Sequence, residues 1–452
     1  MTTSLCMCRG LYPQQLCRSD LHLWGRILRV TDILDDLHWR GLIALTTDEQ
    51  ALRAALAAGP LTLYGGFDPT APSLHIGNLV LILTLRRFQL AGHRPLGLVG
   101  GATGLIGDPS GKSAERVLND RDVVAAWVDR SRAQIEPFLD FAGPNAARMV
   151  NNLDWTAQLS AIDFLRDIGK HFPVNRMVSR ESVAARLDAG ISYTEFSYQI
   201  LQAMDFLELH RRFGCRLQAG GSDQWVNVTT GVDLIRRVTG ERVHALATPL
   251  ITKADGTKYG KTEGDAVWLD PEMTSPYAFY QFWLNQADAD VIRLVKVYSF
   301  RSQEEIEELE KQTVERPAAR VAQRALASEL TAHLHGDGEL ARVEAASRAL
   351  FGQGDLRDLD DRTLAAALAE VPSAEVPLVN GVLPPISDLL ALAGLVPSKS
   401  AGRRTVAEGG AYINNRKATD PEETIGEPDL LFGQWAVLRR GKRSIGSVRV
   451  VR

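Results

Sequence analysis

Two groups of polar residues in the sequence have the types and the spacing needed to handle phosphate. His75 and Asn78 lie one helical turn apart, where a buried strand over 61–66 breaks into a glycine turn and a helix begins. Backbone N–H groups and the positive end of the helix dipole favour an anion at such a place, and both side chains can donate hydrogen bonds. Taken alone, the histidine would more simply be a helix cap or a packing residue.

The second group contains two lysines and a hydroxyl, Lys258, Lys261 and Thr262, in a segment flanked by Gly256 and Gly264. Paired lysines on a glycine-flanked loop can close over a triphosphate and meet the charge that develops on leaving pyrophosphate. Such a loop alone would more often be solvated surface. Its combination with the histidine and asparagine upstream favours phosphate chemistry.

Three strands that break into glycine turns must position these groups. LTLYGG (61–66), PLGLVGGATG (95–104) and CRLQAGGSDQW (215–225) share this pattern, and helices follow the first and third. Strands that alternate with helices predict a parallel α/β sheet, whose ligands gather at the carboxyl ends of the strands. Two helices, with N-caps expected at Thr31-Asp32 and Thr47-Asp48, precede the first strand.

The pattern changes along the chain and predicts several units. We expect an N-terminal extension over 1–30 that lies outside the fold, a Rossmann-like catalytic domain over 31–275, a helical domain over 276–350, a linker over 351–382 and a small α+β module over 383–452. The last unit combines a basic helix at 398–408 with short β-rich pieces.

Composition narrows the class of protein. With 45% hydrophobic and 23% charged residues and no apolar run long enough to span a membrane, the chain is expected to be soluble. Three of its four cysteines, Cys6, Cys8 and Cys17, crowd near the N-terminus, which is not a disulfide framework and favours a cytoplasmic location. We predict no protein metal site. Residues 381–452 hold 11 Lys and Arg against 7 Asp and Glu in a chain of net charge −4, which hints at RNA.

HisIleGlyAsn (75–78) and LysTyrGlyLysThr (258–262) resemble the two signature motifs of class I aminoacyl-tRNA synthetases. Within that class the match is closest to the bacterial tyrosyl-tRNA synthetases, through the segments 64–71, 107–112, 193–206 and 220–225. The resemblance covers residues 31–452. Asn78 stands where the broader class has a second histidine, and LysTyrGlyLysThr replaces LysMetSerLysSer, as both do in the tyrosine branch.

The resemblance implies a role for each site residue. Tyr64 and Asp205 would bind the phenol hydroxyl of tyrosine, Asp108, Tyr198 and Gln202 its ammonium group, and Gln224 its reacting carboxylate. Gly66, Asp68, Gly221 and Asp223 would contact adenosine, His75 and Asn78 the phosphates, and Lys258, Lys261 and Thr262 the pyrophosphate. Lys112 and Arg116 would be further basic groups outside the core site. Independently, Tyr198, Gln202 and Asp205 have the i, i+4, i+7 spacing that places three side chains on one helix face.

The C-terminal module resembles an S4 RNA-binding domain, through ValProSerLysSerAlaGlyArgArg (396–404) and GlyGlyAlaTyrIleAsn (409–414). Lys399, Arg403 and Arg404 would share one helix face suited to phosphate contacts, although a solvated basic helix has the same pattern. The implied partners are L-tyrosine, ATP with Mg²⁺ and tRNA(Tyr), with the helical domain on the anticodon side. The resemblance also implies a homodimer, and no DNA or membrane partner.

Other classes of protein fit the sequence less well. GlyAspProSerGlyLysSer (107–113) has three residues between its glycines where a P-loop has four, and no GxGxxG follows the first strand. A tryptophanyl-tRNA synthetase would have no use for a phenol and an acid placed as Tyr64 and Asp205 are expected to be. A catalytically inactive S4-containing RNA-binding protein would not need His75 or the signature lysines.

Overall fold

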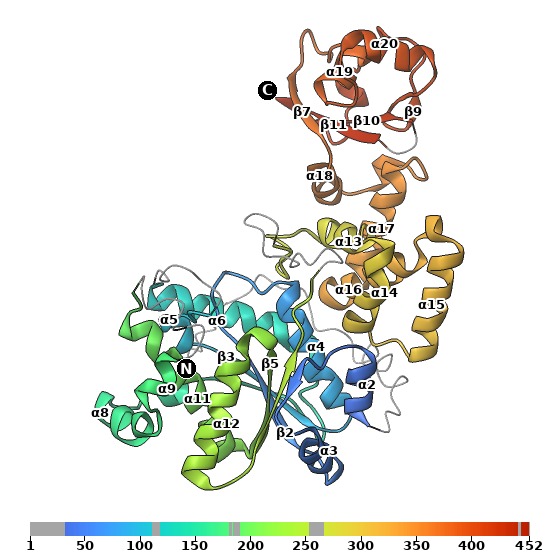
Figure 1. Cartoon of the computed structure of the whole chain (residues 1–452). Helices are drawn as coiled ribbons and strands as arrows, with labels where there is room; N and C mark the ends of the chain where they lie inside the picture. The colour runs from blue at the N-terminus through green and yellow to red at the C-terminus, as the bar shows by residue number, and fades with distance from the viewer. Residues whose placement is uncertain are drawn as a thin grey trace, which may run out of the picture.

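The structure is a computed structural model that describes residues 32–110, 118–179, 183, 190–252, 266–441 and 444–451. The extension expected over 1–30 lies outside the described residues. Figure 1 shows a unit built around a sheet at one end, a group of helices in the middle and a small module at the other end.

A six-stranded sheet forms the centre of the first unit. Its order is β1-β6-β5-β2-β3-β4, and all neighbouring strands are parallel except β1, which runs antiparallel to β6. The strands are β1 (Leu45–Thr46), β2 (Thr62–Phe67), β3 (Arg94–Val99), β4 (Arg148–Asn151), β5 (Cys215–Gly221) and β6 (His244–Thr248). The predicted α/β class with a parallel sheet is confirmed.

Helices cover both faces of this sheet. On one face, α4 (Ile76–Leu90) and α6 (Arg121–Ile135) share an apolar core with Leu63 of β2; on the other, α11 (Tyr193–Phe213) and α12 (Trp225–Thr239) share one with Tyr64. Alternation along the strand therefore sends Tyr64 toward α11. The shorter helices are α2 (Ile33–Trp39), α3 (Glu49–Ala57), α5 (Thr103–Ile106), α7 (Leu153–Thr156), α8 (Ala161–Asp163) and α9 (Val174–Val178). Asp32 and Asp48 cap α2 and α3, as predicted.

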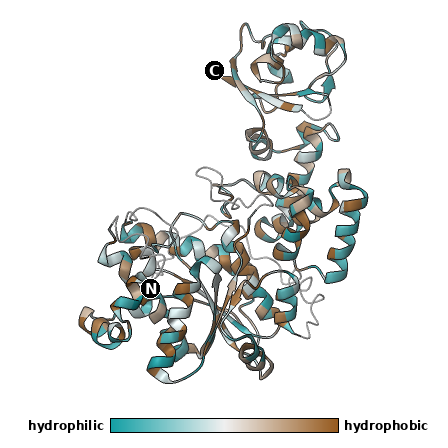
Figure 2. Ribbon diagram, in the orientation of Figure 1, coloured by the Kyte–Doolittle hydropathy of each residue, from teal (hydrophilic) through white to brown (hydrophobic). Residues whose placement is uncertain are grey.

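The middle of the described chain is helical from Pro276 onward. It contains α13 (Pro276–Leu284), α14 (Asp288–Tyr298), α15 (Gln303–Glu315), α16 (Val321–His335), α17 (Asp337–Leu350) and α18 (Asp361–Ala369). Figure 2 shows that α15, at the outer edge, is largely hydrophilic, whereas α16 buries Leu326 and Leu330.

The C-terminal module consists of a five-stranded sheet and two helices. The strands follow the order β7-β11-β10-β8-β9. The elements are β7 (Ser373–Pro377), α19 (Ile386–Leu392), α20 (Lys399–Ala407), β8 (Ala411–Ile413), β9 (Arg416–Lys417), β10 (Trp435–Arg440) and β11 (Ser444–Val451). Strand β7 lies within the predicted linker 351–382 and pairs in parallel with β11. The domain boundaries remain a prediction.

Two buried arginines join the sheet unit to the helical unit. The Nη2 atom of Arg87, in α4, donates to the carbonyl oxygens of Val297 and Ser299, each at 2.7 Å, at the C-terminal end of α14. Arg40 donates to the carbonyls of Lys296, Ser299 and Arg301 from 2.8 to 3.2 Å. Cations at a helix C-terminus interact favourably with its dipole. These contacts fix the position of α14 against α4, the helix that His75 caps.

Replacing Arg87 tests this junction. Arg87→Ala would leave two buried carbonyls without this donor, so we expect a loss of about 3 kcal/mol in the free energy of unfolding. Urea unfolding followed by tryptophan fluorescence measures it. Arg130→Ala, on the exposed face of α6, is the matched control and should change stability by less than about 0.5 kcal/mol. Equal midpoints for the two variants would contradict the assignment.

Candidate active site

The predicted site residues gather at the carboxyl edge of the sheet. Beside β2 the strand order changes direction, since β3 and β4 lie on one side and β5 and β6 on the other. Ligands of open α/β sheets bind in the crevice at such a switch point. Asp68 follows β2, Asn152 follows β4 and Ser222–Gln224 follow β5, so segments far apart in the sequence meet at this edge.

A buried carboxylate, Asp205 on α11, lies on the sheet face that also carries Tyr64. Only 2% of Asp205 is exposed, and it accepts hydrogen bonds from Asn152 Nδ2 (2.9 Å) and Trp155 Nε1 (2.8 Å). Burial raises the pKa of Asp205 to about 7, although both hydrogen bonds lower it. The group can therefore change its charge near neutral pH.

Tyr64 presents a buried hydroxyl with no hydrogen-bond partner among the described residues. Its ring packs against Phe206, with ring centroids 5.3 Å apart. Burial raises the pKa of Tyr64 well above its usual value, and the nearby Asp205 carboxylate raises it further. A buried hydroxyl that lacks a partner costs free energy, so this one is suited to a polar group supplied by a ligand.

A hydrogen-bond network connects Asp205 to the edge of the site at Asp68. Asn152 Nδ2 also donates to Thr103 Oγ1 (2.9 Å), and Thr103 Oγ1 donates to Asp68 Oδ1 (2.6 Å). The hydroxyl of Tyr198 donates to the other oxygen of Asp68 (2.6 Å). A Cβ atom at Gly100 would lie 2.1 Å from Asp68 Oδ1, so only glycine leaves room for this carboxylate.

A second pair of predicted residues forms a polar contact where the loop after α5 meets the turn after β5. Gln224 Nε2 donates to Asp108 Oδ2 (2.7 Å), while the backbone N–H of Ser110 donates to Asp108 Oδ1 (2.9 Å). Asn227 donates to Gln224 Oε1 at 3.0 Å. On α11, Gln202 Oε1 is buried and has no partner among the described residues.

His75 and Asn78 form a capping box at the start of α4. His75 Nδ1 accepts from the N–H of Gly77 (3.0 Å), and Asn78 Oδ1 accepts from the N–H of His75 (3.0 Å). The capping reading is therefore confirmed, but it is compatible with phosphate binding. Because both acceptor atoms serve the helix, the imidazole hydrogen lies on Nε2 and the Asn78 NH₂ group remains as a donor.

The remaining predicted residues fall into two sets. Gly66 lies exposed within β2, one residue before that strand ends. Gly221 is the last residue of β5, and Asp223 lies exposed in the short 3₁₀ turn that follows. Lys258, Lys261, Thr262, Lys112 and Arg116 lie outside the described residues. After the signature segment, Val267 O accepts from the N–H of Ile76 (3.1 Å), so the chain returns beside the start of α4.

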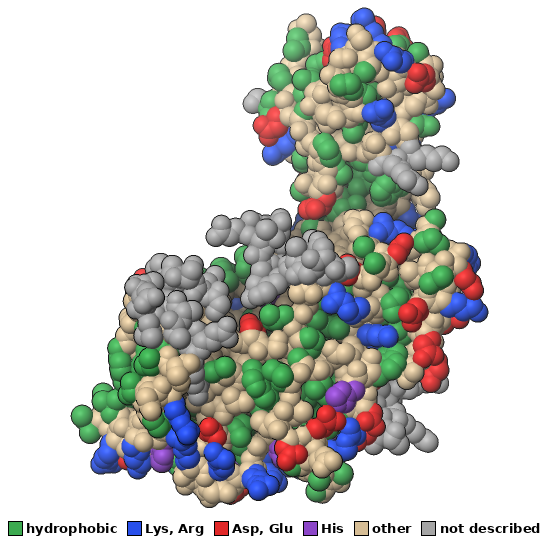
Figure 3. All heavy atoms as spheres, viewed as in Figure 1, with side chains coloured by type: hydrophobic (Ala, Val, Ile, Leu, Met, Phe, Trp, Pro, Cys, Tyr) green, Lys and Arg blue, Asp and Glu red, His purple; other side chains and the backbone are tan. Residues whose placement is uncertain are grey.

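In the C-terminal module, the three predicted RNA-binding residues lie on α20. Lys399 forms an ion pair with Asp388 (2.8 Å) and Arg403 one with Glu422 (2.8 Å), all partly exposed, while Arg404 is exposed. Exposed pairs of this kind contribute little to stability. Figure 3 shows Lys and Arg side chains gathered over this end of the module.

Sequence reasoning missed Asn152, Trp155 and Thr103, which hold the two carboxylates in place. Asn152 is fully buried, and its side chain also accepts from the N–H of Ala102 (2.7 Å). The available signal was the pair Asn151-Asn152 directly after the short apolar run at 149–150, at the place where a strand ends on the ligand edge.

Comparison with known proteins identifies the family of the chain. The family model for class I tRNA synthetases (W and Y) matches residues 56–352, and the model for the tyrosine-tRNA ligase SYY-like C-terminal domain matches residues 363–446. Among the helices that the structure describes, none is both long and apolar enough to cross a membrane.

Individual relatives indicate which branch of this family the chain belongs to. A tyrosine-tRNA ligase of Streptomyces avermitilis is 65% identical over 424 residues, covering 93% of this chain and 99% of that protein, and one of Thermobifida fusca is 59% identical over 430. A C-terminally truncated mitochondrial tyrosyl-tRNA synthetase of Aspergillus nidulans is 27% identical, with a TM-score of 0.65, covering 74% of this chain and all of that one. A tryptophanyl-tRNA synthetase of Encephalitozoon cuniculi, 14% identical with a TM-score of 0.51, shares the fold. The chain belongs to the class I aminoacyl-tRNA synthetases, in the bacterial tyrosine-tRNA ligase family.

Proposed function

We propose that the chain activates L-tyrosine with ATP, giving tyrosyl-adenylate and pyrophosphate, and then transfers the tyrosyl group to the 3′-terminal adenosine of tRNA(Tyr). The observation that carries this proposal is the buried hydroxyl of Tyr64, which has no partner in the described part of the chain and lies near the buried carboxylate of Asp205. A phenol would donate to the carboxylate and accept from the Tyr64 hydroxyl. A ligand without this hydroxyl would leave the Tyr64 hydroxyl unpaired and Asp205 with only its two donors from Asn152 and Trp155, and an unpaired polar group is costly in a buried site.

The other side chains of the site would hold the reacting groups in place. Tyr198 and Asp108 would bind the ammonium group, together with the buried oxygen of Gln202, and Gln224 would orient the carboxylate for attack on the α-phosphate. Gly66, Asp68, Gly221 and Asp223 would bind adenosine. No step requires a protein nucleophile, because positioning and charge neutralisation lower the barrier.

Donors at the start of α4 would bind the phosphates. The NH₂ group of Asn78 and the Nε2–H of His75 would act with the positive end of the helix dipole. Lys258, Lys261 and Thr262 would stabilise the leaving pyrophosphate, a role that rests on their motif. Mg²⁺ would enter with ATP and neutralise phosphate charge.

Two alternative functions, a tryptophanyl-tRNA synthetase and an inactive RNA-binding protein, can be weighed against the hydrogen-bonding groups of the pocket. A tryptophanyl enzyme shares the fold, but an indole N–H can only donate and would leave the Tyr64 hydroxyl without an acceptor. An inactive RNA-binding protein would have no need for the network that holds Asp205 and Asp68. The relatives at 59 to 65% identity are tyrosine-tRNA ligases, which supports the tyrosine enzyme.

The first experiment is ATP–pyrophosphate exchange by the full chain, with tyrosine, tryptophan and phenylalanine offered separately and without tRNA. We expect exchange with tyrosine and a rate with the other two that is lower by several orders of magnitude, since each leaves a buried polar group unpaired. Exchange with tryptophan would overturn the phenol assignment. No exchange with any of them would favour an RNA-binding role without catalysis.

Tyrosine binding should depend on pH through Asp205. Burial raises its pKa to about 7, so the carboxylate that accepts the phenol hydrogen is lost as the pH falls through 7. We expect the Kd for tyrosine, from equilibrium dialysis, to rise roughly eightfold between pH 7.5 and 6, with little change for ATP.

A matched variant tests the cause of this pH dependence. Trp155→Phe removes one donor that stabilises the carboxylate, so the pKa of Asp205 should rise and the midpoint of the profile should move to higher pH. A flat profile in the unaltered chain, or an unmoved midpoint in the variant, would argue against Asp205 as the titrating group.

We also propose a homodimer in the cytoplasm, with the RNA-binding module of each subunit contacting tRNA phosphates through Arg404, Arg403 and Lys399. The support for a dimer is a set of exposed apolar side chains within 161–178: Ile162 (71% exposed), Leu165 (50%) and Val174 (63%). Figure 2 shows hydrophobic colour over α8 at the outer edge of the molecule. Apolar side chains grouped in this way are typical of a protein interface.

Sedimentation velocity tests this surface. We expect the unaltered chain to sediment as a dimer and Ile162→Asp combined with Val174→Asp to sediment as a monomer, because two buried charges would replace apolar contacts. Val314→Asp, at an exposed apolar residue of α15 (78% exposed), is the matched control and should remain dimeric. A dimeric double variant would place the interface elsewhere.

A further inference from the structure

The C-terminal module is attached to the helical unit by more than the chain that links them. The two faces of its sheet belong to different apolar cores. Ala436 and Leu438 of β10 pack in the module's own core with α19 and α20. Val437, between them, and Ile445 of β11 belong to the large core of the body, with Leu356 and Leu368 among its members. The sheet face that carries Val437 and Ile445 is therefore covered by the body.

A two-residue turn of the module reaches the end of a body helix. Strands β8 and β9 form a hairpin closed by Asn414 and Asn415, both with positive φ (46° and 64°), as in a type I′ turn. Asn414 serves its own module, since it donates to Asp429 O (2.8 Å) and accepts from the N–H of Val437 (2.8 Å).

Asn415, the next residue, forms side-chain hydrogen bonds with the body and with no described residue of its own module. Its Nδ2 donates to the carbonyl of Ala349 in the last turn of α17 (2.6 Å) and to that of Gly354 (3.2 Å). The Ala349 carbonyl also accepts from the backbone N–H of Gly352 (3.0 Å), so the Asn415 amide is an additional capping donor that another unit supplies to the end of α17. Asn415 is half-buried, and both of its contacts are with the body.

A second contact lies beside this one. The guanidinium of Arg439 stacks on the Tyr412 ring, with its Cζ 4.2 Å from the ring centroid. A Cβ atom at Gly352, just beyond α17, would lie 2.8 Å from Arg439 Nη2, so the cation sits directly against the backbone there. A positive charge at a helix C-terminus is favourable. The junction thus combines apolar packing, a cap and a charge.

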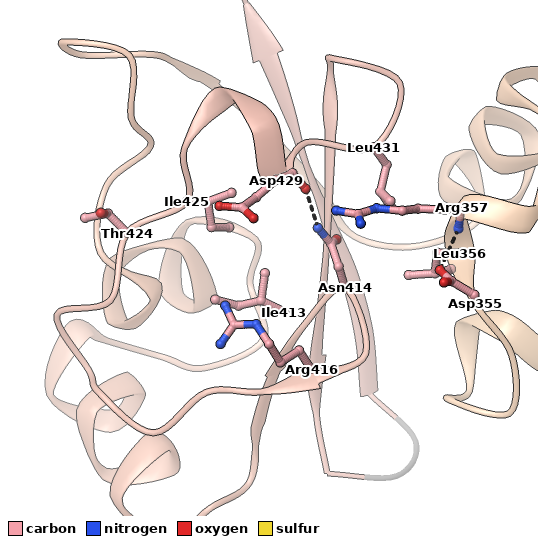
Figure 4. Close-up of a pocket in the computed structure, with 10 residues that line it drawn as sticks. All are labelled: Asp355, Leu356, Arg357, Ile413, Asn414, Arg416, Thr424, Ile425, Asp429 and Leu431. Carbon is pink, nitrogen blue, oxygen red and sulfur yellow. Dashed lines mark hydrogen bonds between the residues drawn. The ribbon is translucent and has the colours of Figure 1, made fainter.

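Figure 4 shows the same junction from the side of a cavity of about 210 Å³. Asp355, Leu356 and Arg357, from the helical side, face Asn414 and Leu431 of the module. The polar contacts of Asn415 and Arg439 lie where the module meets the end of α17, so they resist rotation of the module about its apolar contact.

We propose that Asn415 is a positioning residue for the transfer step: it holds the module in the one orientation that lets tRNA engage α20 and the sheet edge together. This rests on the proposed function. Adenylate formation uses only groups at the carboxyl edge of the first sheet, so it does not depend on where the module lies. Transfer does, because one tRNA must reach both places.

The test compares two Asn→Gly variants of the full chain. Asn415→Gly keeps a residue that accepts positive φ but removes the amide. Asn380→Gly makes the same change at an exposed residue with φ 53° in the turn after β7. We expect Asn415→Gly to raise the KM for tRNA in aminoacylation roughly threefold to tenfold, the range for one or two lost hydrogen bonds. Its tyrosine-dependent pyrophosphate exchange, and both activities of Asn380→Gly, should match those of the unaltered chain.

A change on the body side separates positioning from direct RNA contact. Leu356→Ala loosens the same junction at a residue that is 1% exposed, and it should show the same split between the two activities. Small-angle X-ray scattering should show a larger maximum dimension for Asn415→Gly than for Asn380→Gly, because the module is released.

Several results would overturn the proposal. An unchanged KM for tRNA in Asn415→Gly, an equal rise in Asn380→Gly, or a parallel loss of pyrophosphate exchange would each do so, the last by assigning Asn415 to the stability of the body. Failure of the proposed function is distinguishable, because it would appear in the unaltered chain as an absence of tyrosine exchange or of charged tRNA.

Discussion

The proposed site depends on a carboxylate that is buried away from water and held by hydrogen bonds. Asp205 is 2% exposed, and burial alone would favour its protonated form. Two donors, the amide of Asn152 and the indole of Trp155, oppose that tendency and also fix the direction in which the carboxylate can accept a further hydrogen. Asn152 is itself held by hydrogen bonds to Thr103 and to the backbone of Ala102, so the position of the Asp205 carboxylate depends on these residues as well.

The same network couples the two halves of the proposed substrate site. Thr103 bridges Asn152 and Asp68, and Tyr198 donates to Asp68 from the helix that carries Asp205. Groups assigned to the phenol, the ammonium and the adenosine therefore share one set of hydrogen bonds. A rigid arrangement of this kind suits a reaction in which positioning and charge neutralisation, without a protein nucleophile, lower the barrier.

Local sequence signals were sufficient for the elements that begin at a clear cap. Asp32, Asp48 and His75 cap helices where expected. The glycine turn predicted at the end of the first strand was wrong, because β2 runs through Gly65 and Gly66 to Phe67 and pairs with β3 there. The pairing of Tyr198 with Asp68 and of Gln224 with Asp108 could not be predicted from spacing, because those partners lie on different elements and meet only through the fold. Strand β7 was missed for a related reason: SerAlaGluValPro has a weak alternating pattern, and its conformation is fixed by pairing with β11.

Because both faces of the C-terminal sheet are covered by apolar packing, the module cannot easily be separated from the rest of the chain. A unit with a complete core of its own can be joined to an unrelated protein without exposing apolar surface. This one cannot, because Val437 and Ile445 belong to the core of its neighbour and Trp435 packs against that core. Moving the module to another protein would expose these side chains unless the segment around Leu356 moved with it.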